Sequence, residues 1–319
     1  SLRHVPESRR PGVRSIDWLG ALFATLGLGG VVYGLINSSI LGWTHPLVYG
    51  SFIAGLISVY LFLQAEARAR SPMVPLGLFR SRTFSGANLI TLCLYAAIGV
   101  FFFLLPLTLI QIHGYSPTAA GAAGLPFILL MSSLSRWSGG LVSRYGARLP
   151  LTLGPLISAA GLLLFSWPSV GGSYWSTFFP AYVVLGLGMT VTVAPLTTAV
   201  MQAVDKDHAG TASGINNAVA RIAGLLAIAV LGLVMLAAFR SHLHQSLRRL
   251  ALPQPVVQQI QANEIKLAAL PLPEALDANT KSALKASIDQ AFIAGFRLVI
   301  WICAVLAVAS AIIARLWIE

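Results

Sequence analysis

The chain has 319 residues, of which 56% are hydrophobic and only 10% are charged. Its mean hydropathy of +0.79 excludes an ordinary soluble domain. Uncharged stretches of roughly 20 residues, the length that spans a bilayer, recur along the whole sequence, so we predict an all-α polytopic membrane protein. The net charge of +11 does not indicate a nucleic-acid partner, because the cations gather at the ends of apolar runs, as they do in cytoplasmic loops.

The first part of the chain alternates basic and apolar segments. Residues 1–16 are polar and basic, and we predict a cytoplasmic linker there. Residues 17–66 hold two apolar runs, which predict two transmembrane helices, and residues 67–83 predict a basic cytoplasmic loop. The first run is rich in small residues that suit close helix packing. These residues are Gly27, Gly29, Gly30 and Gly34.

The third span, at about residues 84–112, carries a polar and aromatic stripe. Asn88, Thr91, Tyr95 and Phe102 fall on one helix face. The stripe either lines a cavity or makes a helix–helix contact with its polar atoms satisfied locally.

Three further spans follow at about residues 117–138, 149–166 and 175–201. We expect Pro126 to kink or break the first of them. The glycines, the threonines and the proline of the segment GLGMTVTVAPLTT make the third of them bendable and partly polar, and Thr190 lies in this segment.

The seventh span, at about residues 208–239, places polar groups inside an apolar run. Gly210 and Gly214 form a small-xxx-small pair that favours close approach of a neighbouring helix. Asn216, Asn217 and Arg221 follow. An arginine at that depth costs several kcal/mol unless it faces a polar interior. Arg221 therefore serves a gate or solute cavity, or it binds backbone carbonyls or snorkels to the inner surface.

Residues 240–287 are polar and predict an outer loop, with a short amphipathic helix at about 256–269. The last span, at about 289–315, contains Arg297, which brings the total to about eight transmembrane helices. The short loops place Lys and Arg on alternate sides, which predicts that both termini are cytoplasmic and that the protein is a multi-pass protein of the inner (plasma) membrane. The basic residues of 240–287 would by the same rule place this segment in the cytoplasm. We give them less weight, because long loops are translocated with less regard to their charge.

Seven segments occur in an order that resembles the fourteen-span drug:proton antiporters of the major facilitator superfamily, the EmrB/QacA type. They are VPESR, DWLGALFATLGLGGVVYGL, PLGLFRSRTFSGANL, GYSPTAAGAAGLP, GGLVSRYGARLP, VAPLTTAV and HAGTASGINNAVARIAG. The resemblance implies that residues 17–66 are the two extra central helices and that 84–319 are the C-terminal six-helix bundle. The N-terminal six-helix bundle would then be missing from this chain.

The segment GGLVSRYGARLP resembles the signature cytoplasmic gate loop of the superfamily. The resemblance assigns the gate to Gly139, Ser143, Arg144, Gly146 and Arg148. Ser143 stands where the family usually has Asp, and a hydroxyl carries no charge, so a charge-based latch in this half is in doubt.

The resemblance implies a secondary carrier that exports amphipathic or cationic small molecules in exchange for protons by alternating access. The residues proposed to line its cavity are Asn88, Tyr95, Thr190, Asn216, Asn217 and Arg221. The acidic residues near the spans lie at their edges, so we expect the proton relay in the missing half. The expected partners are therefore the lipid bilayer, a small-molecule substrate and protons.

Other classes of protein are weighed against this hypothesis. The chain lacks a GxxxxGK[ST] loop, which argues against ATP as the energy source, and we expect no cofactor, metal or catalytic site. Cys93 and Cys303 sit in apolar runs and are interpreted as small hydrophobic residues. A half-size carrier that works as a homodimer, or a non-transporting sensor or scaffold derived from the same fold, remains an alternative.

Overall fold

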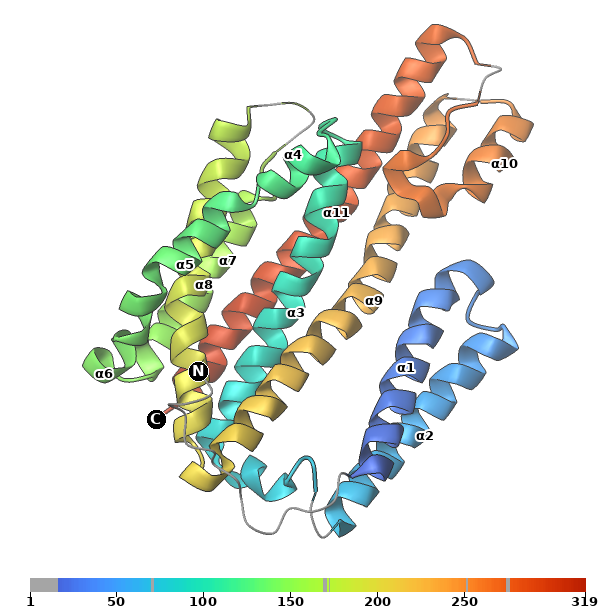
Figure 1. Ribbon diagram of the computed structural model, residues 1–319. Helices are drawn as coiled ribbons and strands as arrows, with labels where there is room; N and C mark the ends of the chain where they lie inside the picture. The colour runs from blue at the N-terminus through green and yellow to red at the C-terminus, as the bar shows by residue number, and fades with distance from the viewer. Residues whose placement is uncertain (1–16, 70–71, 169–170, 172, 251, 274–275) are drawn as a thin grey trace.

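The computed structural model describes residues 17–69, 72–168, 171, 173–250, 252–273 and 276–319, and helices make up its whole architecture (Figure 1). In chain order the elements are α1 (Trp18–Leu41), α2 (Pro46–Arg68), η1 (Leu76–Arg80), α3 (Arg82–Gln111), α4 (Pro117–Ala122), α5 (Leu125–Gly139), α6 (Leu141–Tyr145), α7 (Arg148–Leu164), α8 (Tyr174–Gln202), η2 (Lys206–His208), α9 (Ala209–Leu250), α10 (Gln254–Ala262), η3 (Glu264–Ala269) and α11 (Ala278–Trp317). Predicted segments 1–16 and part of 67–83 lie outside the described residues.

The prediction of an all-α polytopic fold is confirmed. Within the described ranges, seven helical segments are long and apolar enough to cross a membrane, counting α4 with α5 and η2 with α9. The fifth predicted span corresponds to α7, which is apolar but has only 17 residues. The helices α1, α2, α3 and α8 begin and end close to the expected positions, because about 20 apolar residues are needed to cross the hydrocarbon layer.

Polar side chains fix where several helices begin. Asp17, Ser81, Ser116 and Asp277 each accept a hydrogen bond from a backbone N–H of the first helical turn. Pro126, in the first turn of α5, follows a break between α4 and α5, as predicted.

The α1–α2 hairpin packs through its glycines and lies beside α9 (Figure 1). A Cβ atom on Gly55 would lie 2.6 Å from the Val31 nitrogen, and one on Gly30 would lie 2.7 Å from the Ser51 carbonyl oxygen. A Cβ on Gly29 would meet nothing within 4 Å. The two helices therefore touch backbone to backbone along one face of α1, as the glycine-rich sequence predicts.

The remaining long helices form a bundle around α3, which packs against α9 and α11. Its buried residues include Leu94, Phe101 and Leu105, each with no exposed surface. α7 packs against α8 and α11, and α5 covers α8. Asn88 and Thr91, the polar part of the α3 stripe, are buried within this bundle.

α7 and α8 approach each other as closely as the hairpin helices do. A Cβ atom on Gly188 would lie 2.4 Å from the Ser158 nitrogen, and one on Gly161 would lie 2.5 Å from the Leu185 nitrogen. We predicted that the glycines of this segment make the helix bendable. In the structure, Gly188 has no side chain that would hold α7 and α8 apart, and the bendability of α8 stays a prediction.

Residues 240–287, predicted as an outer loop, are largely helical. α9 continues to Leu250 and α11 begins at Ala278, so these helices have 42 and 40 residues. At 1.5 Å per residue each is about 60 Å long, about twice the hydrocarbon thickness of a bilayer. We call residues 240–287 the helical cap; it holds the tail of α9, α10, η3 and the start of α11 (Figure 1).

The helical cap has its own apolar core and a buried ion-pair cluster. Four of its apolar side chains are at most 4% exposed: Leu243, Leu247, Ile260 and Leu284. The segment is polar on average, but its helices bury apolar side chains against one another. Glu264 is 4% exposed. Its carboxylate lies 3.1 Å from Arg240 Nε and 2.5 Å from His244 Nε2. These contacts extend α9 and α11 beyond the predicted ends of the spans.

Candidate functional site

A polar cluster joins α3 to α9 inside the bundle. Asn216 Nδ2 donates to Thr91 Oγ1 at 2.6 Å and to Asn88 Oδ1 at 3.3 Å. Asn88 Nδ2 donates to the Phe84 carbonyl at 2.9 Å, and Asn88 and Thr91 are almost fully buried. The α3 stripe therefore makes a helix–helix contact at this end and satisfies its polar atoms locally.

Further along the same two helices the stripe lines a pocket of about 410 Å³. The lining residues are Tyr95, Ile98, Gly99, Phe102, Ala220, Arg221, Gly224, Leu225 and Ile228. A Cβ on Gly99 would lie 2.9 Å from the Gly224 Cα, so the two backbones meet at this point. The wall is mostly apolar, with the Tyr95 hydroxyl and the Arg221 guanidinium as its polar groups.

The two arginines embedded in predicted spans have different environments. Arg297 donates to the carbonyl oxygens of Trp167 and Pro168 at 3.4 and 3.2 Å, in the turn after α7. Arg221 is exposed at the α3–α9 pocket, and within the described ranges no hydrogen bond or ion pair holds its guanidinium. Arg221 is therefore available to a partner outside this bundle, whereas Arg297 is held by backbone carbonyls.

Two predicted cavity residues lie away from the pocket. Thr190 is 3% exposed, its hydroxyl donates to the Gly186 carbonyl at 2.7 Å, and its own carbonyl accepts from Ser138. Asn217 is exposed and its amide donates to the Ser213 carbonyl one turn earlier. The structure thus brings Tyr95 and Arg221 to the pocket, with Asn88 and Asn216 nearby on the same helices.

The small-residue pair of α9 does not act as predicted. No heavy atom lies within 4 Å of a Cβ position on Gly210 or Gly214. The close approach occurs at Gly224, about three to four turns later, opposite Gly99. Sequence reasoning missed Gly99, Gly224, Leu225 and Ile228, since nothing distinguishes a pocket-lining glycine or aliphatic residue from its neighbours in an apolar run.

The predicted gate loop forms the short helix α6 and the turns around it. Gly146 ends α6 with φ of +73°, a conformation that favours glycine. Ser143 Oγ donates to the Gly140 carbonyl at 2.9 Å, within its own loop. Arg148 donates to the Arg315 carbonyl in the last turn of α11, and Arg144 lies 5.3 Å from the centre of the Tyr145 ring. Gly139, the last residue of α5, lies in open space. Arg148 is therefore the gate-loop residue that ties α7 to α11.

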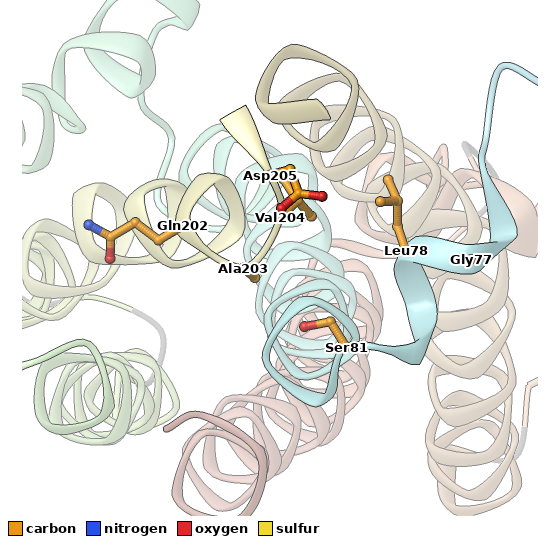
Figure 2. Close-up of a pocket in the computed structure, with 7 residues that line it drawn as sticks. All are labelled: Gly77, Leu78, Ser81, Gln202, Ala203, Val204 and Asp205. Carbon is orange, nitrogen blue, oxygen red and sulfur yellow. The ribbon is translucent and has the colours of Figure 1, made fainter. Parts of the chain in front are cut away.

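A second hollow, of about 330 Å³, lies near the start of α3 (Figure 2). It is lined by Gly77, Leu78, Ser81, Gln202, Ala203, Val204 and Asp205. Figure 2 shows the Gln202 side chain directed away from Ser81 and Asp205. Ser81 Oγ already accepts from the Phe84 N–H at 3.2 Å, so these polar groups do not converge on one ligand.

The fold and the sequence identify the class of protein. The profile of the Major Facilitator Superfamily matches residues 2–228. The chain belongs to the Major Facilitator Superfamily. Among the residues that the structure describes, no three His, Cys, Asp or Glu side chains are grouped to hold a metal ion.

Individual relatives add detail. The chain is 32% identical over 277 residues to the multidrug resistance protein Stp of Mycobacterium tuberculosis, covering 85% of this chain and 50% of Stp. It is 28% identical over 304 residues to the tetracenomycin C resistance and export protein of Streptomyces glaucescens, covering 94% and 56%. The chain thus spans about half the length of these relatives.

A solved structure shares the fold. It is a bacterial homologue of the human lysosomal transporter Spinster, in an inward-facing and unoccupied conformation. The TM-score is 0.52 with 16% sequence identity, and the match covers 93% of this chain and 67% of the solved chain.

Proposed function

We propose that this chain belongs to a secondary active exporter of amphipathic small molecules, in which the α3–α9 pocket forms one wall of the substrate cavity. The observation that carries the proposal is the exposed, unpaired Arg221 beside Tyr95 and Phe102 on an open, mostly apolar surface. Membership of the Major Facilitator Superfamily and similarity to proteins named for drug resistance and export support it. Binding sites for small molecules are generally concave and apolar with few polar groups.

The chemistry of the pocket narrows the class of substrate. Tyr95, Phe102, Leu225 and Ile228 offer apolar surface to an aromatic or aliphatic body. The Arg221 guanidinium attracts an anionic or hydrogen-bond-accepting group and repels a cation. A cationic substrate therefore needs a carboxylate from the facing wall of the cavity to neutralise Arg221.

The proposal assigns the facing wall to a second six-helix bundle, which corresponds to the part of the relatives that this chain does not match. Alternating access would then move the two bundles about the substrate, with proton entry as the driving reaction. In this scheme α1 and α2 are the two extra central helices of a fourteen-span carrier. The short basic loops around η1 and α6 support a cytoplasmic location for the α6 end and for both termini, with the helical cap on the outer side.

The test is export by cells that produce the complete open reading frame containing this chain. The probes are ethidium, a cation, and Nile red, a neutral amphipath, with and without a protonophore. The central variant is Arg221→Ala, and Arg249→Ala, an exposed arginine in the helical-cap part of the same helix, is its matched control.

We expect protonophore-sensitive efflux of at least one probe in the wild type and in Arg249→Ala. We expect at least an approximately tenfold change in efflux rate in Arg221→Ala, which corresponds to about 1.4 kcal/mol. If Arg221→Ala exports both probes at the wild-type rate, the proposed role of the pocket is refuted. If cells that produce the wild-type protein export neither probe faster than cells without it, the result would count against the exporter function itself.

A further inference from the structure

Two carboxylates meet where the α1–α2 hairpin begins and ends. Asp17 caps the N-terminus of α1, and its Oδ1 accepts from the Gly20 N–H at 2.7 Å. Glu66 lies in the last turn of α2, and its Oε2 accepts from the Val74 N–H at 3.0 Å. Each carboxylate therefore uses one oxygen to hold local backbone and keeps one oxygen spare.

The two spare oxygens lie close to the same residue, Gly20. The Cβ position of Gly20 is 2.7 Å from Asp17 Oδ2 and 3.0 Å from Glu66 Oε1. Since both oxygens surround one point, they are at most about 6 Å apart, the range over which like charges strongly disfavour joint ionisation. Gly20 has no side chain to separate them.

Both spare oxygens are also buried without a partner. Within the part of the chain that the structure describes, neither Asp17 Oδ2 nor Glu66 Oε1 accepts a hydrogen bond. The Glu66 residue is only 2% exposed. Arg68 is the nearest cation in sequence, yet the ion pairs of the described residues do not include it or either carboxylate. Two like charges at buried oxygens that lack a partner among the described residues would carry a desolvation and repulsion cost.

We propose that Asp17 and Glu66 form a site for one proton, held on Glu66 Oε1 beside Asp17 Oδ2. One proton, taken up from water at this end of the hairpin, removes one of the two like charges and leaves a single negative charge on the pair. The charge belongs on Asp17, because the N-terminus of α1 stabilises an anion there. The proton belongs on Glu66, because the C-terminus of α2 disfavours an anion in its last turn.

The site is a property of the hairpin and stands independently of transport. Its use as a station for the exchanged proton rests on the proposed function, and it would place a protonatable group within this chain. We expected the proton relay in the missing half because each acidic residue was considered at its own span edge. The hairpin joins two of those edges.

The test is infrared spectroscopy of the full chain in lipid nanodiscs at neutral pH, with the C=O stretch of a protonated carboxylic acid as the signal. We expect the wild type to show this band and to shift it on exchange into D₂O. Glu66→Gln should lose the band and still fold, because the side-chain amide has the size and the neutral charge of the protonated acid and can still accept from the Val74 N–H. Glu264→Gln, which changes another buried glutamate that is ion-paired, is the control and should keep the band.

A second variant guards against an unfolded sample. Asp17→Asn removes the like charge, so Glu66 should ionise more readily and the band should disappear at a lower pH than in the wild type. A wild-type spectrum without the band at neutral pH, or a band that survives in Glu66→Gln, would overturn the proposal. The efflux assay and this spectrum are separate readouts, so failure of the proton site and failure of the exporter function are distinguishable.

Discussion

The contact between α7 and α8 leads to a sharp prediction about stability. We expect Gly188→Ala to destabilise the bundle and Gly186→Ala, two residues earlier in the same helix, to be tolerated. A Cβ on Gly188 would lie 2.4 Å from the Ser158 nitrogen and 2.8 Å from the Gly154 carbonyl oxygen, both of them backbone atoms. A Cβ on Gly186 would lie 3.3 Å from Leu130 Cδ1, the end of a flexible side chain, and 3.3 Å from the Phe127 Cα.

The magnitude follows from how far the helices must move. Ordinary van der Waals contact begins at 3.4 Å, so α7 and α8 must separate by about 1 Å at Gly188, a gap that forfeits a quarter to a half of each affected contact. Overpacking of this kind costs about 1–3 kcal/mol, and the better helix propensity of Ala recovers at most about 1 kcal/mol. We therefore expect a net loss of about 1–2 kcal/mol in the free energy of unfolding for Gly188→Ala.

The assay is thermal unfolding in a mild detergent, followed by intrinsic tryptophan fluorescence. A loss of about 1–2 kcal/mol predicts a Tm lower by roughly 2–8 °C for Gly188→Ala, and a Tm near the wild-type value for Gly186→Ala. Equal Tm values for the two variants, or a lower value for Gly186→Ala, would refute the reasoning that backbone contact at Gly188 sets the separation of α7 and α8.

Three further predictions concern other polar contacts. Asn216→Leu removes the donor to Asn88 and Thr91 and should lower the free energy of unfolding by about 1 kcal/mol, measured as a shift in Tm. The control is Asn217→Leu, because the Asn217 amide donates only to a carbonyl of its own helix. Equal Tm shifts in the two variants would count against a stabilising role of the cluster. Glu264→Ala leaves Arg240 and His244 without their buried partner, so hydrogen exchange should speed up in the helical cap and stay unchanged in α3; unchanged exchange in the cap would contradict this. The hydrogen bonds from Thr280 hold the pKa of Asp277, the N-cap residue of α11, below its ordinary value. The Asp277 carboxylate therefore stabilises the start of α11 at pH values above the ordinary Asp pKa, and this stabilisation is lost as the pH falls through the lowered pKa. Amide exchange at the first turn of α11 should show that loss on acidification in the wild type and not in Asp277→Ala, and equal pH profiles would refute it.

The transmembrane part of the fold could be predicted because one physical requirement dominates it. A span needs a long uncharged helix, so hydropathy alone located α1 to α3, α8 and the membrane part of α9. The helical cap was missed because its residues are polar on average, and that average hid the helical periodicity of its apolar side chains. Phe239, Leu243 and Leu247 recur at helical spacing and are buried. The spacing of the apolar residues therefore indicated a packed helix, whereas the mean hydropathy of the segment did not.

The candidate site could be predicted only where a residue was unusual for its surroundings. Asn216 and Arg221 stood out because polar groups inside an apolar run need a reason. Thr190 met the same criterion and yet faces the packing against α5, because residue type does not set how a helix is rotated in the bundle. The meeting of Asp17 and Glu66 was out of reach for a similar reason, since it depends on the glycine-set register of α1 on α2.

The most direct test of the central claim is whether substrate occupies the α3–α9 pocket. The measurement is the rate at which a maleimide labels Ala220→Cys, which lines the pocket, beside Ala218→Cys, which is exposed on the same helix outside it. Both variants carry Cys93→Ala in the complete reading frame, and Cys303 is fully buried. We predict that an exported probe slows labelling of Ala220→Cys several-fold and leaves Ala218→Cys unchanged. Equal labelling rates with and without an exported probe at Ala220→Cys would contradict the assignment of this pocket to the substrate cavity.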